Sequence, residues 1–162
     1  MGDELVYFGY GANRSGAMVH AITGRLPLAA SARLDGYELC IQTWDEIPPD
    51  VRGTLTERGW SDMFRAYCIR KADGKSVSGT AWNLTQQERD LVSEWDMCGR
   101  WYAPVGTSIS LDSGELVTAT TEMIDDPKIR QSVEGDNYLM FLNNKAQMVR
   151  TAIAVRGRYN IR

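Results

Sequence analysis

The chain has 162 residues, of which 43% are hydrophobic and 24% are charged, and its formal net charge is −3. These values are typical of one compact globular domain with a buried core, so we expect a single domain over residues 1–162. The basic residues are scattered rather than gathered in a stripe, which argues against nucleic acid or an anionic membrane surface as a partner.

Targeting signals are not evident in the sequence. No apolar run approaches the ~20 residues that a membrane-spanning helix needs. The chain begins with Met-Gly-Asp-Glu, which is acidic where a signal peptide would be basic. We therefore expect no membrane association and a cytoplasmic location.

The cysteines argue against a metal site or a disulfide framework. Cys40, Cys68 and Cys98 are widely spaced without a C-x-x-C pair, and His20 is the one imidazole in the chain. We expect reduced thiols, with Cys40 buried in an apolar, strand-like run. Spacing alone leaves open a nucleophilic cysteine that uses His20 as its base.

The first segment with a clear pattern is LVYFGYGAN at residues 5–13, which predicts a buried strand that opens into a tight loop. Leu, Val, Tyr and Phe suit a buried pleated surface, whereas glycine allows positive φ or a close backbone approach. Residues 15–22 then predict a short helix. A strand, a small-residue loop and a helix in this order can direct several backbone N–H groups at one anion. An ordinary glycine turn between two elements is the alternative interpretation.

Five further segments carry the patterns of β-strands. They alternate apolar and polar residues or are rich in Val, Ile and Thr, and they cover residues 32–41, 64–69, 77–84, 102–111 and 115–124. Gly36 predicts a kink in the first of them. Turn residues at 72–75 and 112–114 predict that the other four form two antiparallel hairpins, which brings the total to about six strands.

Residues 44–59 follow neither the helix period nor the strand period. They contain Pro48, Pro49, Gly53 and several charges, which predicts an irregular excursion over the surface. Long loops often carry binding residues, so this excursion is a candidate lid and a candidate source of specificity.

The sequence TQQE at residues 85–88 has the spacing of a capping box and predicts a helix that ends near residues 98–99. Its apolar positions share one face at 3.6-residue spacing, namely Leu84, Leu91, Val92 and Trp95. Glu94 and Asp96 flank this face near the helix C-terminus, where the helix dipole makes a carboxylate slightly more basic. The helical wheel leaves open which of the two acids faces a site.

The C-terminal region predicts one more helix. Asp136 and Asn137 can cap it, and its apolar residues, expected to pack over the sheet, are Tyr138, Leu139, Phe141, Leu142 and Ala146. Residues 152–159 alternate weakly, which leaves open a last short strand or a frayed end.

Three blocks of sequence occur in an order that is more specific than any one of them. They are YFGYGAN at residues 7–13, ARLDGYEL at 32–39, and VSGTAWNL at 77–84 with the helix to Asp96 and the following Trp101 and Tyr102. Together they resemble the Y-F-x-Y-G-S-N loop, the A-x-L-x-G-Y-x-L strand, and the G-x-x-W strand, helix, acid and tyrosine of the gamma-glutamylcyclotransferase-like family. The resemblance covers most of the chain and implies an α+β fold, a small mixed β-barrel of about six strands with flanking helices.

The resemblance also implies an activity. A gamma-glutamylcyclotransferase-like enzyme, of acyltransferase or lyase type, would cleave a small γ-glutamyl amine, amide or peptide and release 5-oxoproline and a free amine, without a cofactor or metal. The α-amino group attacks its own γ-carbonyl, so positioning supplies much of the rate, and a carboxylate moves the proton. The implied partner is a small-molecule γ-glutamyl substrate, and the implied assembly is a monomer or homodimer. The alternatives are a catalytically silent homologue that binds a γ-glutamyl or other carboxylate ligand, and a cysteine-dependent hydrolase.

The same resemblance implies the site residues. By position after the helix, the catalytic glutamate of the family corresponds to Asp96, and the loop serine corresponds to Ala12. Aspartate withdraws the carboxylate by about one carbon–carbon bond, so Glu94 stays an alternative. Tyr138 matches a tyrosine near the family's pocket, with core packing as the other interpretation. The loop residues expected to hold the substrate are Tyr10, Gly11, Ala12 and Asn13.

Overall fold

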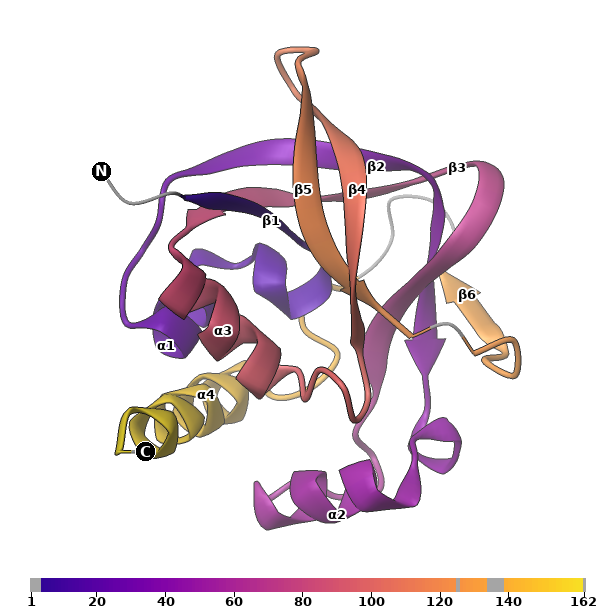
Figure 1. Cartoon of the computed structure of the whole chain (residues 1–162). Coiled ribbons are helices and arrows are strands. Elements are labelled where there is room, and N and C mark those ends of the chain that lie inside the picture. Colours follow the sequence, from indigo (N-terminus) through magenta and orange to yellow (C-terminus); the bar gives the residue numbers. More distant parts are fainter. Residues whose placement is uncertain (1–3, 125, 134–138, 162) are drawn as a thin grey trace.

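The structure is a computed structural model that describes residues 4–124, 126–133 and 139–161. Its strands form a closed barrel (Figure 1). Its strands are β1 (Leu5–Gly9), β2 (Ala29–Gln42), β3 (Ala66–Leu84), β4 (Ala103–Leu111), β5 (Leu116–Met123) and β6 (Gln131–Val133). Their order is β3-β1-β5-β4-β2-β6, and an additional pairing of β3 with β2 closes the first five into a ring. Because β1 is antiparallel to β3 and parallel to β5, the sheet is mixed. The predicted α+β fold with a small mixed barrel of about six strands is confirmed.

The two longest strands, β2 and β3, pair antiparallel along nearly their whole length and curve together around the barrel (Figure 1). The predicted hairpin between residues 64–69 and 77–84 is wrong, because most of both segments belongs to the single strand β3, which pairs with β2. The turn-forming residues 72–75 lie instead where the register shifts, opposite Gly36. Gly36 has a φ of +83°, so the predicted kink in β2 is confirmed.

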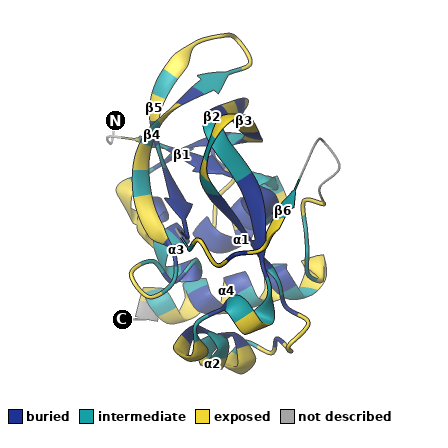
Figure 2. Cartoon of the chain, turned by 90° about the vertical axis from the view of Figure 1, so that its right-hand side faces the viewer, coloured by how far each residue is buried: buried dark blue, intermediate teal, exposed yellow. Residues whose placement is uncertain are grey.

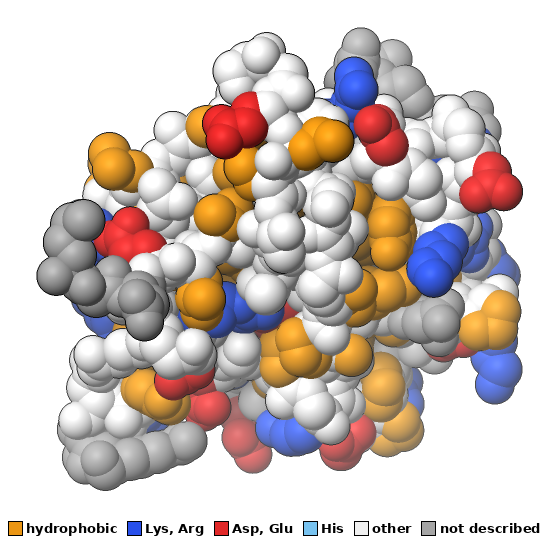
Figure 3. Space-filling model, turned by 45° about the horizontal axis from the view of Figure 1, so that its top comes forward, with side chains coloured by type: hydrophobic (Ala, Val, Ile, Leu, Met, Phe, Trp, Pro, Cys, Tyr) orange, Lys and Arg blue, Asp and Glu red, His pale blue; other side chains and the backbone are white. Residues whose placement is uncertain are grey.

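The predicted hairpin of β4 and β5 is confirmed, and its tip extends beyond the body of the barrel in Figure 1. Nearer the barrel, β5 pairs in parallel with β1 at Thr120 and Tyr7. The short strand β6 pairs with β2 and was not predicted, because a strand of three residues is too short to show an alternation. On the face shown in Figure 3, basic side chains are interspersed with acidic and hydrophobic ones.

The α-helices of the described residues are α1 (Gly16–Thr23), α2 (Pro49–Glu57), α3 (Gln86–Trp95) and α4 (Lys145–Ile161). α1 packs against α4 and α3, and the three form one group beneath the barrel; α2 lies below this group and shares its apolar core (Figure 1). Figure 2 shows buried residues on the inner sides of this group and exposed residues outside. α3 begins with the predicted capping box, because the side chains of Thr85 and Glu88 each accept the other's backbone N–H.

The prediction of an irregular excursion at residues 44–59 is wrong, because this segment folds into a short 3₁₀ helix, η2 (Trp44–Glu46), and then α2. Pro49 occupies the first turn of α2, where a missing N–H costs nothing. Val51 and Leu55, four residues apart, are buried on its inner side. Burying such side chains is worth about 1.5–3 kcal/mol each, which outweighs the ~1 kcal/mol cost of Gly53 inside the helix.

The last helix begins later than predicted. The cap expected at Asp136 lies outside the described residues, residues 139–144 are not helical, and α4 starts at Lys145. Asn144 is its actual cap, since its Oδ1 accepts the N–H of Gln147 at 2.9 Å. The interpretation of residues 152–159 as a strand or a frayed end is also wrong, because they lie within α4. The buried residues of α4 recur at helical spacing, at Met148, Ala152 and Val155.

β1 lies between two apolar cores. Tyr7 belongs to the core that joins the helices to the barrel, and Phe8 belongs to the core inside the barrel. Successive residues of a strand point to opposite faces, so both side chains are buried, at 2% and 0% exposure. The end of β1, where the predicted loop begins, is therefore held from both sides.

Gly79→Ala tests this tight packing around β1. A Cβ at Gly79 would lie 2.5 Å from both the Gly9 carbonyl oxygen and the Phe8 ring, and the carbonyl cannot move aside without displacing β1. The free energy of unfolding, measured by urea denaturation, is expected to fall by about 1–3 kcal/mol. Gly106→Ala is the matched control, because a Cβ there meets nothing within 4 Å. Equal stability of the two variants would contradict the packing described here.

Candidate active site

The loop after β1 folds into a 3₁₀ helix, η1 (Gly11–Arg14), which leads into α1. Gly9 is required because a Cβ there would lie 2.3 Å from the Asn13 carbonyl oxygen. Gly11 is required for two reasons, since its φ is +64° and a Cβ would lie 2.6 Å from the Tyr67 ring. The two glycines let the chain turn back on itself directly after the strand. As a result, the residues after Gly11 face the interior.

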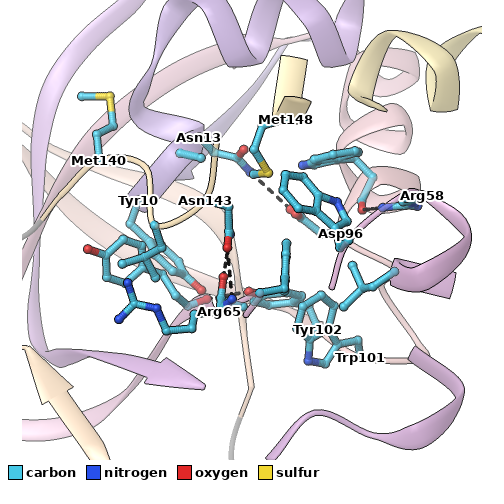
Figure 4. Close-up of a pocket in the computed structure, with 18 residues that line it drawn as sticks. Tyr10, Asn13, Arg58, Arg65, Asp96, Trp101, Tyr102, Met140, Asn143 and Met148 are labelled. Carbon is cyan, nitrogen blue, oxygen red and sulfur yellow. Dashed lines mark hydrogen bonds between the residues drawn. The ribbon is translucent and has the colours of Figure 1, made fainter. Parts of the chain in front are cut away.

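This loop forms one wall of a cavity of about 90 Å³ (Figure 4). Tyr10, Ala12 and Asn13 line it from the loop, and Asp96, the C-cap of α3, lines it from the helix. Aromatic side chains form much of the remaining wall, namely Trp60, Phe64, Tyr67, Trp95, Trp101 and Tyr102. The cavity is therefore largely apolar, with one carboxyl group beside the loop.

The structure brings four of the predicted site residues together in this cavity, namely Tyr10, Ala12, Asn13 and Asp96. Asn13 Nδ2 donates a hydrogen bond of 3.3 Å to Asp96 Oδ2, which joins the loop to α3 (Figure 4). Gly11 does not line the cavity; it lies buried beside Tyr67 and shapes the loop. Tyr138 lies outside the described residues.

Asn13 is held in place by several contacts besides Asp96. Its Nδ2 also donates to the Tyr7 hydroxyl at 2.8 Å, and its carbonyl oxygen accepts the Trp82 Nε1–H at 2.8 Å. Tyr7 comes from β1 and Trp82 from β3, so barrel strands fix the loop. Burial raises the pKa of the Tyr7 hydroxyl, which keeps it neutral at physiological pH.

The structure distinguishes the two acids that the helical wheel left open. Glu94 lines a separate cavity between α2, α3 and α4, together with Met97 and Arg100, whereas Asp96 lines the cavity beside the loop. Met97 has a φ of +54°, a left-handed conformation that is unusual for a residue with a side chain, and it turns the chain away directly after Asp96. Of the two acids, Asp96 is therefore the one that the geometry places at the cavity beside the loop.

The environment of Asp96 favours its protonated form. The residue as a whole is partly exposed, but its carboxyl group is enclosed by side chains. Burial raises the pKa of this carboxyl well above its usual range, and the nearby charge of Glu122 raises it further; Arg89 and Arg58 act in the opposite direction with smaller effect. A carboxyl group that exchanges its proton closer to neutral pH suits general acid–base catalysis.

Arg58 is a cavity residue that the sequence did not reveal. It follows α2 directly, its Nη1 donates to the Trp95 carbonyl oxygen at 3.0 Å, and its guanidinium lies 5.0 Å from the centre of the Trp95 ring. It thereby caps the C-terminal end of α3 next to Asp96. Because residues 44–59 were predicted to be irregular, no pattern pointed to a fixed arginine at this place.

A buried ion pair behind Asp96 was also not anticipated. Arg89 Nη1 donates to Glu122 Oε1 at 2.7 Å, and the two side chains are only 7% and 3% exposed. One signal was present in the sequence, since Arg89 precedes Asp96 by seven residues and so lies two turns away on the same face of α3. Glu122 is a charged residue in a predicted strand, and nothing local showed that it points inward.

The segment at residues 139–144 forms part of the cavity wall. The Tyr67 hydroxyl donates to the Leu139 carbonyl oxygen at 2.6 Å. Asn143 makes two hydrogen bonds with the backbone of Arg65, of 3.1 Å and 2.7 Å (Figure 4). Met140 from this segment lines the cavity. The site is thus assembled from the loop, α3, β3 and the chain that precedes α4.

The geometry gives no support to a cysteine nucleophile. Cys40 and Cys68 are buried opposite each other on β2 and β3, and Cys98 lines the cavity that contains Glu94. Burial raises the pKa of the Cys98 thiol, so its nucleophilic thiolate form is disfavoured. His20 is exposed on α1 and does not line the cavity beside the loop.

The described ranges contain neither a group of metal-binding side chains nor a helix suited to span a membrane. In residues 4–124, 126–133 and 139–161, no three His, Cys, Asp or Glu side chains are grouped so that they could hold a metal ion. Within the same ranges, no helix combines the length and the apolar character that a membrane span requires.

Comparison with known proteins identifies the fold. No family model and no curated protein matches the sequence. A solved structure named gamma-glutamyl cyclotransferase matches with a TM-score of 0.61 at 16% identity over 96% of this chain and 81% of that one. An uncharacterized protein from Homo sapiens matches with a TM-score of 0.60 at 16% identity over 95% and 80%. An AIG2-like protein from Mus musculus matches with a TM-score of 0.54 at 14% identity over 84% and 88%.

Replacing Asp96 by Asn is expected to stabilise the protein at pH 8. Burial raises the folded-state pKa above the unfolded value, so stability is lost as the pH rises from about 4 through the folded pKa. Asn has nearly the same shape but cannot ionise. Urea denaturation should therefore give Asp96→Asn a higher free energy of unfolding than wild type at pH 8, and a smaller difference at pH 4.

The matched control for this variant is Asp62→Asn, because Asp62 is exposed. Its free energy of unfolding is expected to stay within about 0.5 kcal/mol of wild type at both pH values. If Asp96→Asn also matches wild type at both, the Asp96 carboxyl does not have the enclosed environment described here.

Proposed function

The chain has the gamma-glutamylcyclotransferase-like fold, and we propose that it is an enzyme that cleaves a small γ-glutamyl amine, amide or peptide by intramolecular cyclisation. The products are 5-oxoproline and a free amine. The observation that carries the proposal is the enclosed Asp96 carboxyl, hydrogen-bonded to Asn13 of the loop at one end of an aromatic cavity. A loop that can hold an anion and a carboxyl that can move a proton are the two components that the reaction requires.

The reaction can be written with these residues. The α-amino nitrogen gives a proton to the side chain of Asp96 and attacks the γ-carbonyl carbon, so that a ring N–C bond forms. Backbone N–H groups of the loop at residues 10–13 hold the substrate carboxylate or the developing oxyanion. The bond from the carbonyl carbon to the leaving nitrogen then breaks, and that nitrogen receives the proton. No water is consumed, and an enclosed cavity favours ring closure over hydrolysis.

The charges in the cavity indicate which amines it would accept. Among the described lining residues, Asp96 is the acidic side chain, whereas Arg58 and Arg65 are basic and the rest are aromatic, aliphatic or amide. A cationic amine half, as in a γ-glutamyl polyamine, would be repelled by these two arginines. Apart from Asp96, the described lining residues would offer it no carboxylate as a partner. An apolar or carboxylate-bearing amine half would meet aromatic rings and guanidinium groups.

Asp96→Asn tests the acid–base role. Release of 5-oxoproline from a panel of γ-glutamyl compounds should fall by about 10²–10⁴-fold, because Asn cannot carry the proton. Glu94→Gln is the matched control on the same helix and should retain wild-type activity, since Glu94 lines the other cavity. Loss of activity in Glu94→Gln with full activity in Asp96→Asn would reverse the assignment.

The same assay tests the substrate class. Among γ-glutamyl compounds, those of apolar or carboxylate-bearing amines should have higher kcat/KM than that of putrescine or another diamine, because of the repulsion from Arg58 and Arg65. In Arg65→Gln, the kcat/KM values of the diamine compound and of the other compounds should lie closer together. A diamine conjugate that is the best substrate would contradict this account of the cavity.

A second candidate is a binding protein without activity. The observation behind it is the aspartate at the position of the family's glutamate, with a shorter side chain already hydrogen-bonded to Asn13. This candidate predicts that none of the γ-glutamyl compounds yields 5-oxoproline, while at least one binds in isothermal titration calorimetry.

A further inference from the structure

A second cavity, of about 30 Å³, lies behind Asp96, with space for about one water molecule. Its lining residues are Tyr7, Tyr10, Asn13, Asp96, Tyr102 and Glu122. Tyr10, Asn13, Asp96 and Tyr102 also line the larger cavity, so Asp96 stands between the two. Glu122, which comes from β5 and is 2% exposed, lines the small cavity together with Asp96.

Glu122 is held rigidly on one side and lacks a partner on the other. Its Oε1 accepts from Arg89, whose guanidinium is fixed by Thr120 Oγ1 and Ser93 Oγ, both at 3.0 Å. Its Oε2 is buried and receives no hydrogen bond from the N–H groups or hydroxyls of the described residues. A buried carboxylate oxygen without a donor is costly, so the structure must provide one in another form.

A proton on Asp96 would supply this donor. The Asp96 side chain is within hydrogen-bonding reach of Glu122, and a carboxyl group donates only when it is protonated. The Cys98 thiol also reaches Glu122, but S–H is a weak donor. Two enclosed carboxyl groups in contact cannot both ionise without strong repulsion. Arg89 pairs with Glu122, which makes Glu122 the place for the negative charge and Asp96 the place for the proton.

We propose that Asp96 and Glu122 form a carboxyl pair that holds one proton, with Glu122 as the positioning residue that acts through Asp96. The buried cluster then contains one positive charge on Arg89 and one negative charge on the pair, and so is neutral. With both carboxyls ionised it would carry an uncompensated negative charge in the interior, which is strongly unfavourable.

The groups that face Asp96 from other elements are one further cation and three hydroxyls. Arg58 approaches from the end of α2, but it lines the cavity beside the loop and not the small cavity that Glu122 lines, so it lies outside the buried cluster counted above. Tyr7 comes from β1, Tyr10 comes from the loop, and Tyr102 is the residue before β4. Burial raises the pKa of each hydroxyl, so all three stay neutral. The Tyr10 hydroxyl donates to the Glu122 carbonyl oxygen and thereby holds β5 against the loop.

The pair has a consequence for catalysis, which rests on the proposed function. When the substrate amino group gives a proton to Asp96, the proton already on Asp96 moves to Glu122 Oε2, and the pair becomes neutral. When Asp96 gives a proton to the leaving nitrogen, the proton on Glu122 returns to Asp96. Every proton is accounted for within the pair and the substrate. A short aspartate can therefore act as base although it is protonated at rest.

The carboxyl pair can be tested without an activity assay. The ¹³C NMR signal of the Asp96 carboxyl carbon is followed as the pH is changed. In Glu122→Gln the negative charge is lost and the amide donates to Asp96, so the acid dissociation constant of Asp96 should increase at least about tenfold. Glu115→Gln, an exposed change at the tip of the same hairpin, is the control and should leave it unchanged. An unchanged Asp96 titration in Glu122→Gln overturns the proposal.

A second variant covers the case in which Glu122→Gln leaves Arg89 unpaired and fails to fold. Arg89→Met combined with Glu122→Gln removes both charges together, a change that proteins often tolerate. Because Glu122 affects Asp96 more strongly than Arg89 does, the Asp96 titration should still move to lower pH. A titration at the wild-type position in this double variant also overturns the proposal.

Kinetics separate this proposal from the proposed function. In an active enzyme, Glu122→Gln should lower kcat at least about tenfold with little change in KM, and should move the acidic limb of the kcat profile to lower pH. An unchanged pH profile overturns the role of Glu122. If wild type releases no 5-oxoproline from any compound, the proposed function fails, whereas the NMR titration still decides whether the pair exists.

Discussion

The enclosure of the Asp96 carboxyl is the constraint around which the site is built. Removing a carboxylate from water costs several kcal/mol unless charges and hydrogen bonds replace the lost hydration. Here Asn13 from the loop and Arg89 from α3 replace part of that hydration, whereas Glu122 from β5 adds a like charge that favours the protonated form. An environment that destabilises the charged form of Asp96 in the folded protein also raises the pKa of its carboxyl group toward neutral pH. Stability and acid–base function are opposed at this position.

The barrel makes that convergence possible. β1 pairs with β3 on one side and with β5 on the other, so the strand that precedes the loop is adjacent to the strand that carries Glu122. The absence of a Cβ at Gly9 and Gly11 lets the loop return close to the barrel end. α3 follows β3 directly, and its capping box sets where the helix begins and hence where Asp96 ends it. Leu55 of α2 and Arg58, which follows this helix, help to close the cavity beside the loop.

Local features could be predicted because they depend on residues that are close in sequence. The strand before Gly9, the capping box at residues 85–88 and the hairpin of β4 and β5 are of this kind, and the structure confirms all three. The hairpin predicted at residues 64–84 was wrong because turn residues in a long curved strand resemble those that reverse the chain in a hairpin. Pairing with β2 decides between the two, and β2 lies outside the segment. Residues 44–59 form a helix because Val51 and Leu55 find a core, which is again information from outside the segment.

The sequence by itself determined the first strand, the start of α3, the hairpin of β4 and β5, the tight loop at Gly9 and Gly11, and the presence of an acid at the end of α3. These depend on local sterics, periodicity and capping, which are encoded within a few residues. Only the tertiary structure decided that Asp96 rather than Glu94 faces the cavity beside the loop, and that Glu122 stands behind it. Which side chain is enclosed, and by which charges, depends on how distant strands pair, and no short stretch of sequence contains that information.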